Sequence, residues 1–110
     1  MMTSKDFLKA FGGEILEFSG YVEGGFYYSK SCDDQEWMVT VTPISTEGMK
    51  LDPAATLNTL AATNSSVYVE ACKNDVKIFE GEVGQNLRGS LVLISNPDIA
   101  PKRGGALSVI

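Results

Sequence analysis

Residues 66–83 read Ser-Val-Tyr-Val-Glu-Ala-Cys-Lys-Asn-Asp-Val-Lys-Ile-Phe-Glu-Gly-Glu-Val, and this stretch decides the fold. Two apolar-rich runs, 67–71 and 76–80, flank the segment 72–75. Within that segment, Asn74 and Asp75 tolerate the left-handed backbone that tight turns require. The pattern therefore predicts a β-hairpin, and we expect the rest of the chain to be arranged around it.

The length of the hairpin loop determines which residues face each other. A loop formed by residues 72–75 gives pairs that are apolar, aromatic or oppositely charged: Ala71 with Val76, Glu70 with Lys77, Val69 with Ile78 and Tyr68 with Phe79. A shorter turn at Asn74 and Asp75 would instead set Val69 against Glu80 on the buried face. Pair chemistry favours the longer loop, and we take that register as the prediction.

In this register one face of the hairpin is almost entirely apolar and forms the core side. Tyr68 and Phe79 then lie together on the opposite face, flanked by Glu70 and Lys77. Aromatic side chains with a charged rim are typical of protein interfaces. We hypothesise an interface with a second copy or another protein, formed by Tyr68, Glu70, Lys77 and Phe79 and by Leu107 and Val109 of the C-terminal segment. The alternative is that the chain's own tail covers the aromatic pair.

Two helices are predicted from their end signals. Thr3 at the start and Gly12 at the end bound a short amphipathic helix over 3–13. Asp52 followed by Pro53 is typical of a helix N-terminus, and it predicts a second helix over 52–65.

Strands are predicted where apolar residues alternate or run continuously. These segments are 14–23, 26–28, 37–42, 91–94 and 106–110, in addition to the hairpin. The run 91–94 is continuously apolar, which predicts a central strand covered on both faces. The polar segment 29–36 predicts a surface loop.

This order of elements predicts a single α+β domain over residues 1–110. Its antiparallel β-sheet has about six strands and is backed by two helices, in the order α-β-β-β-α-β-β-β, with a further short strand at the C-terminus. The order resembles that of the small acidic dimeric chaperones of type III secretion. The chain departs from that pattern because it lacks a long last helix, and no motif accompanies the likeness.

Composition excludes several classes of function. The 14 acidic against 9 basic side chains give a net charge of −5, which disfavours nucleic-acid binding, and no segment has the length of a membrane span. The chain has no histidine, which removes Ser-His and Cys-His nucleophiles and every histidine-containing zinc site. Because no signal peptide is recognisable and Cys32 and Cys72 form no metal-binding motif, we expect a cytoplasmic protein whose thiols are reduced and packed.

Two groups of carboxylates are candidates for a metal or catalytic site. Asp33, Asp34 and Glu36 lack the spacing of a calcium loop, and they predict a solvated surface loop without a functional metal. Glu80 and Glu82 alternate along a strand, which is typical of an edge strand protected against mispairing. The sequence therefore predicts no catalytic residue, no metal site and no cofactor.

Two hypotheses for function remain. The first is a non-catalytic protein-interaction module, such as an adaptor, inhibitor, immunity-type or chaperone-type subunit, that binds a protein partner or forms a homodimer. The second is a small-molecule-binding domain or a histidine-independent enzyme, with a pocket lined by Tyr27, Tyr28, Trp37 and Tyr68. An apolar cavity would favour the second hypothesis, and an exposed aromatic patch would favour the first.

Overall fold

The computed structural model describes residues 2–44, 52–86, 92–99 and 104–109. It has an α+β fold, as predicted, with two helices and one antiparallel sheet. The helices are α1 (Ser4–Phe11) and α2 (Pro53–Ala62). The strands are β1 (Leu16–Val22), β2 (Gly25–Cys32), β3 (Gln35–Pro43), β4 (Ser66–Lys73), β5 (Val76–Gly84), β6 (Leu93–Asn96) and β7 (Ala106–Val109).

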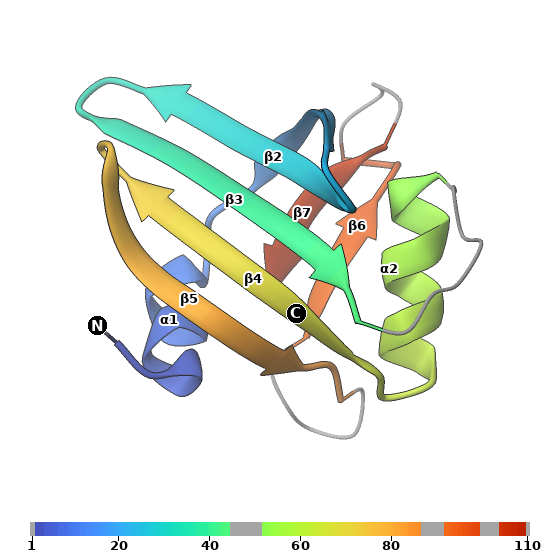
Figure 1. Cartoon of the computed structure of the whole chain (residues 1–110). Coiled ribbons are helices and arrows are strands. Elements are labelled where there is room, and N and C mark those ends of the chain that lie inside the picture. The colour runs from blue at the N-terminus through green and yellow to red at the C-terminus, as the bar shows by residue number, and fades with distance from the viewer. Residues whose placement is uncertain (1, 45–51, 87–91, 100–103, 110) are drawn as a thin grey trace.

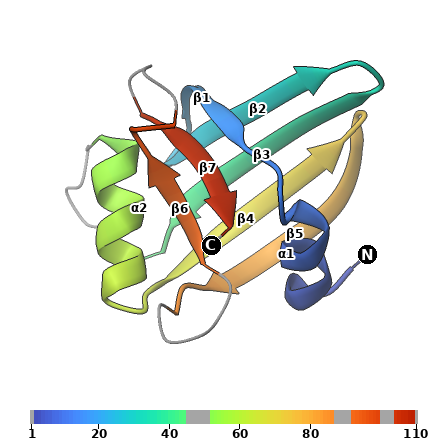
Figure 2. The ribbon, with the colours of Figure 1, turned by 180° about the vertical axis from the view of Figure 1, so that it is seen from behind.

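The sheet has 7 strands in the order β5-β4-β3-β2-β1-β7-β6, so β5 and β6 form its edges. The sheet is strongly curled (Figure 1). Strands β2 to β5 form one layer, and the β6–β7 hairpin lies behind them with α1 and α2 on either side, as Figure 2 shows from behind. The core fills the space between these two layers.

Both helices begin at the predicted caps. In α1, the hydroxyl of Thr3 accepts a hydrogen bond from the backbone N–H of Asp6 at 3.1 Å. In α2, the carboxylate of Asp52 accepts one from the N–H of Ala54 at 3.1 Å, and Pro53 follows as the first helical residue. These caps satisfy N–H groups that have no partner inside the helix.

The helices close the two open sides of the curled sheet. From α1, Phe7 is fully buried and its ring stacks on Phe79 of β5, with centroids 4.8 Å apart. On the other side, the amide of Asn58 on α2 donates to the backbone carbonyl of Ser95 at 2.9 Å. Asn58 thereby satisfies a carbonyl of edge strand β6.

The predicted loop over 29–36 is wrong. Strand β2 continues to Cys32 and β3 begins at Gln35, so only Asp33 and Asp34 form the turn. Asp33 has a positive φ of 50°. The polar side chains in this segment obscured the strands, although the extended ladder satisfies the backbone groups of both.

The predicted hairpin register is also wrong. The turn consists of Asn74 and Asp75 alone, both with positive φ, and Lys73 faces Val76. A β-bulge then shifts the ladder, because Cys72 faces Lys77 whereas Ala71 faces Phe79. Ile78 is the extra residue of β5.

The bulge turns Phe79 toward the core. Phe79 is 3% exposed, whereas Tyr68 on the neighbouring strand is 40% exposed on the opposite side of the sheet. The prediction that these two aromatic side chains share a face is therefore wrong. Without the bulge, the short turn would place Glu80 opposite Val69 on the buried face; with it, Val69 faces Gly81 and Glu80 points outward.

The C-terminal strand is paired, as predicted. In β7, Leu107 faces Leu16 of β1 and Ser95 of β6, and Val109 faces Leu93. Ile110 lies outside the described residues. Of the segment predicted as a central strand, Leu93 and Ile94 begin β6 instead, which is an edge strand, and Leu93 is buried in the core.

Two further predictions concern the thiols and the membrane. Cys32 and Cys72 are both free cysteines, but Cys32 is exposed and only Cys72 is half-buried, so the prediction that both thiols are packed is wrong for Cys32. Neither helix in the described part of the chain has the length and apolar character needed to span a membrane.

Candidate functional site

The four aromatic side chains predicted to line a pocket lie on two different sides of the sheet. Tyr28 and Trp37 are buried in the core. The Trp37 ring packs edge-on against Phe11, with centroids 5.5 Å apart. Tyr27 and Tyr68 point to the other side, in alternation with the buried residues of their strands. These four residues therefore do not line a common cavity.

The six residues predicted for an interface are also divided. Tyr68, Glu70 and Lys77 lie together on the outward side of β4 and β5. Phe79 and Leu107 are buried in the core, and Val109 is half-buried against it. Only the first three residues are available at the surface as a group.

We define the outer face as the outward side chains of β2 to β5. It comprises Tyr27, Ser29, Ser31, Glu36, Met38, Thr40, Thr42, Ser66, Tyr68, Glu70, Cys72, Lys77, Glu80 and Glu82. No helix or strand in the described part of the chain covers this face (Figure 1).

The ladder places the outer-face residues in rows across the strands. Tyr27 faces Thr40, which faces Glu70, which faces Glu80. In the next row, Thr42 faces Tyr68, which faces Glu82. Small hydroxyl side chains on β3 thus lie between two tyrosines, and carboxylates lie toward the edge strand β5.

A hydrogen-bonded network holds the β5 side of this face. The ammonium group of Lys77 lies 3.3 Å from a carboxylate oxygen of Glu80 and 3.9 Å from one of Glu70. Hydrogen bonding to the Tyr68 hydroxyl, and then to Lys77, lowers the pKa of Glu80. The hydrogen bond to Glu80 is in turn the main reason why the pKa of Tyr68 and the pKa of Lys77 are raised. The network favours the ionised carboxylate of Glu80.

Tyr27 lies at the other end of this arrangement. Partial burial is the main cause that raises its pKa, and the negative charge of Glu36 adds to the effect. A neutral hydroxyl on a half-buried ring can contact apolar and polar groups of a partner alike.

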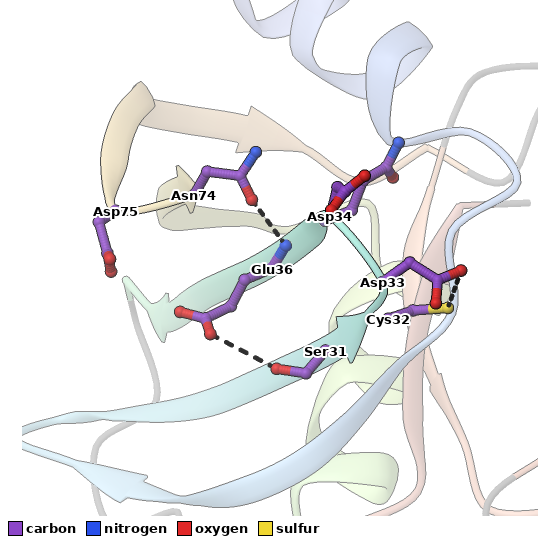
Figure 3. Close-up of a pocket in the computed structure, with 8 residues that line it drawn as sticks. Ser31, Cys32, Asp33, Asp34, Glu36, Asn74 and Asp75 are labelled. Carbon is purple, nitrogen blue, oxygen red and sulfur yellow. Dashed lines mark hydrogen bonds between the residues drawn. The ribbon is translucent and has the colours of Figure 1, made fainter.

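A separate hollow of about 260 Å³ lies at the tips of the β2–β3 and β4–β5 hairpins (Figure 3). The two tips are joined by reciprocal hydrogen bonds: the N–H of Asn74 donates to the carbonyl of Glu36, and the N–H of Glu36 donates to the side-chain oxygen of Asn74, both at 2.8 Å. The hollow is polar and open to solvent on the outside of the sheet. Its lining comprises Ser31, Cys32, Asp33, Asp34, Gln35, Glu36, Asn74 and Asp75.

The carboxylates around this hollow do not converge on one point. In Figure 3, the carboxylate of Asp33 lies beside the thiol of Cys32, and that of Glu36 lies beside the hydroxyl of Ser31. Asp75 points away from both. Among the residues that the structure describes, no group of three or more His, Cys, Asp or Glu side chains could hold a metal ion.

Sequence reasoning missed several members of the outer face, chiefly Met38, Thr40 and Thr42 on β3. A usable signal was present, because these residues alternate along β3 with the large apolar side chains of Trp37, Val39 and Val41. The partnership of Lys77 with Glu80 had no such signal, since it depends on the bulge.

Comparison with protein-family models, with curated proteins and with solved structures found no match to this chain.

Proposed function

We propose that this chain is a non-catalytic protein-interaction module that binds its partner through the outer face. The observation that carries the proposal is the setting of Tyr68. This side chain is 40% exposed, and it lies between the hydroxyl-bearing strand β3 and the charged network of Glu70, Lys77 and Glu80. An aromatic residue with a charged rim on an uncovered sheet is the composition typical of protein interfaces.

The other face of the sheet is already covered by the chain itself, which leaves the outer face for a partner. The side chains of the covered face, among them Trp37, Val39 and Val69, are packed against α1, α2 and the β6–β7 hairpin. Surface hollows in the described residues are polar and are lined by hairpin-tip or strand side chains. Small-molecule sites are usually enclosed and largely apolar, so the pocket hypothesis has less support.

Affinity purification from the native host tests the proposal. The tagged wild-type chain is compared with Tyr68→Ala, which removes the ring from the outer face, and with Ile99→Ala. Ile99 is 45% exposed in the turn after β6, and it is a matched control because it also offers an exposed apolar side chain. We expect one protein at stoichiometric ratio with wild type and Ile99→Ala, and a strongly reduced amount with Tyr68→Ala.

Equal recovery from all three chains would show that binding uses another surface and would contradict the proposal. A retained small molecule in place of a protein would favour the pocket hypothesis. Circular dichroism of each purified chain must show the same fold, so that a loss of binding reports on the face alone.

A further inference from the structure

We infer that the outer face binds a segment of a different protein that presents lysine or arginine side chains, and that it does not bind a second copy of this chain. The inference rests on the proposed function, because it names the chemistry of the partner that the outer face accepts.

The charged side chains at the outward positions of β1 to β5 are mostly acidic. The acidic ones are Glu17, Glu36, Glu70, Glu80 and Glu82. At the outward positions of these five strands, the one basic side chain is Lys77. The other lysines of β2 and β4 point to the opposite side, where Lys30 contacts Glu14 at 3.3 Å and Lys73 lies over the ring of Trp37. The outer face therefore carries much of the chain's net charge of −5.

Lys77 offsets only part of this charge. Its ammonium group already lies within 3.3 Å of Glu80 and 3.9 Å of Glu70. These two carboxylates face each other directly across the β4–β5 ladder, so Lys77 is needed between them. Glu82 extends the acidic surface along the edge strand, next to Tyr68.

A second copy would meet this surface with the same surface. In a two-fold symmetric contact the same patch meets itself, with residue i of one copy against residue j of the other and j against i. Because Lys77 is the one basic side chain at the outward positions of β1 to β5, most charged pairs across such a contact would be glutamate against glutamate. Like charges brought together at an interface oppose binding, whereas opposite charges favour it and accelerate the encounter. Nucleic acids and anionic membranes are disfavoured for the same reason.

A basic protein segment fits the chemistry of the face on two counts. Lysine and arginine pair with the carboxylates, and arginine makes paired hydrogen bonds to a carboxylate. The tyrosine rings of Tyr27 and Tyr68 offer aromatic surface over which a cationic side chain can lie. Threonine hydroxyls on β3 supply further hydrogen bonds between the two rings.

Peptide binding tests the inference with two defined probes. One peptide alternates arginine with threonine, and the other replaces each arginine with glutamate. Fluorescence anisotropy measures their binding to the full-length chain at low and at high salt. We expect binding of the arginine peptide alone, with an affinity that falls as salt rises.

Charge-matched variants show where the peptide binds. Glu70→Gln combined with Glu80→Gln and Glu82→Gln removes three carboxylates from the outer face. The control Asp33→Asn combined with Asp34→Asn and Asp98→Asn removes the same charge from turns away from its centre. We expect about a tenfold or greater loss of affinity in the first variant and a much smaller loss in the control. Equal losses would show unspecific attraction and overturn the inference.

Two further measurements keep the outcomes distinct. Amide shifts of the wild-type chain during the peptide titration should centre on Thr40, Tyr68 and Glu82; shifts confined to Asp33 and Asp34 would overturn the inference without relying on a variant. Light scattering should give a monomer mass for the free chain. A dimer that Tyr68→Ala dissociates would support a protein-binding face but refute the basic partner. A native partner that stays bound at high salt would likewise refute the basic partner. If no protein at all binds in a way that depends on Tyr68, the proposed function itself is refuted.

Discussion

Glu70 on β4 lies directly opposite Glu80 on β5, and the ammonium group of Lys77 contacts both carboxylates. Like charges in a facing pair destabilise an antiparallel ladder. The bulge at Ile78 creates this pair, because a regular ladder would set Glu80 against Val69 on the buried side. It also brings Glu80 to the same side of the sheet as Lys77, which faces Cys72 in the neighbouring row and lies near both carboxylates. The charge pattern of the outer face therefore depends on a backbone irregularity.

The ionisation of Glu80 tests this network. Tyr68→Phe removes the hydroxyl that is the main cause of the lowered pKa of Glu80, and Lys77→Met removes the second contributor. We expect the pKa of Glu80 to rise in both variants relative to wild type. NMR titration of the carboxyl carbon of Glu80 measures the change. Lys5→Met is the charge-matched control, because Lys5 belongs to α1 and this helix lies behind the sheet (Figure 1).

The sign of the stability change follows from the direction of this shift. Because the pKa of Glu80 is lowered in the folded state, its contribution to stability is present above the unfolded value and is lost as the pH falls through the folded value. The stability difference between wild type and Lys77→Met should therefore be largest near neutral pH and shrink in acid. A difference that is independent of pH would contradict the network.

Phe79 and Tyr68 should respond oppositely to truncation. Phe79→Ala opens a cavity beneath α1, where Phe79 stacks on Phe7, and should lower the free energy of unfolding by about 3–5 kcal/mol. Tyr68→Ala removes an exposed ring and should cost far less. Urea unfolding measures both changes. Similar losses in the two variants would mean that the two side chains share an environment.

The bulge itself can be tested by deletion. Removing Ile78 eliminates the extra residue, so the ladder becomes regular while Ala71 still faces Phe79 and Val67 still faces Val83. We expect a folded chain with reduced stability, because Ile78 also packs partly against the core. Contacts between Val67 and Val83 in NMR spectra report the retained register.

Deleting Glu80 is the matched control. It keeps the bulge but shifts every later residue of β5 by one position, which turns Glu82 inward and Val83 outward. We expect that chain to be unfolded or insoluble. If both deletions damage the fold equally, Ile78 is not the residue that sets the register.

The contrast between helices and hairpin shows what the sequence can predict. The caps at Thr3 and Asp52 are local signals, and both helices begin where those residues place them. The hairpin register depends on a bulge whose energy is set by partners across the sheet. A short turn with a regular ladder would set Glu80 against Val69, and the predicted register avoids this pair by a longer loop. The chain avoids it by inserting Ile78.

The candidate surface was predictable in part for the same reason. Residues of β3 alternate regularly, so Thr40 and Thr42 could have been assigned to the outer face from their alternation with Trp37 and Val39. In β5, the bulge changes the side of the sheet on which the following residues lie. Because the sequence gives no sign of this bulge, Phe79 is wrongly predicted to lie at the surface. Which strands lie at the edges depends on long-range pairing, and the short β6 was consequently expected in the centre.

No functional metal binding is predicted at the hairpin tips. Asp33 and Glu36 are engaged with Cys32 and Ser31, and their carboxylates point in different directions. Hard divalent cations need several oxygen ligands directed at one point. Calorimetric titration with calcium, magnesium and manganese should therefore detect no tight binding. Micromolar affinity that Asp34→Ala abolishes would refute this prediction.

The junction between the two layers depends on Gly104, just before β7. Its φ is +94°, and an added Cβ would overlap the ring of Phe18 on β1. Its carbonyl accepts hydrogen bonds from the buried hydroxyls of Tyr28, at 3.4 Å, and Ser95. Displacement of this backbone would therefore also disturb two buried polar groups.

Gly104→Ala should consequently be among the most damaging small substitutions in the chain. Left-handed backbone strain contributes about 1–2 kcal/mol, and overpacking against Phe18 adds about 1–3 kcal/mol. Gly13→Ala separates the two effects, because Gly13 has a similar φ of +87° but no atom lies within 4 Å of the added Cβ. Urea unfolding should show the larger loss for Gly104→Ala. If the two losses are equal, backbone strain alone explains the glycine and the close contact with Phe18 has no energetic role.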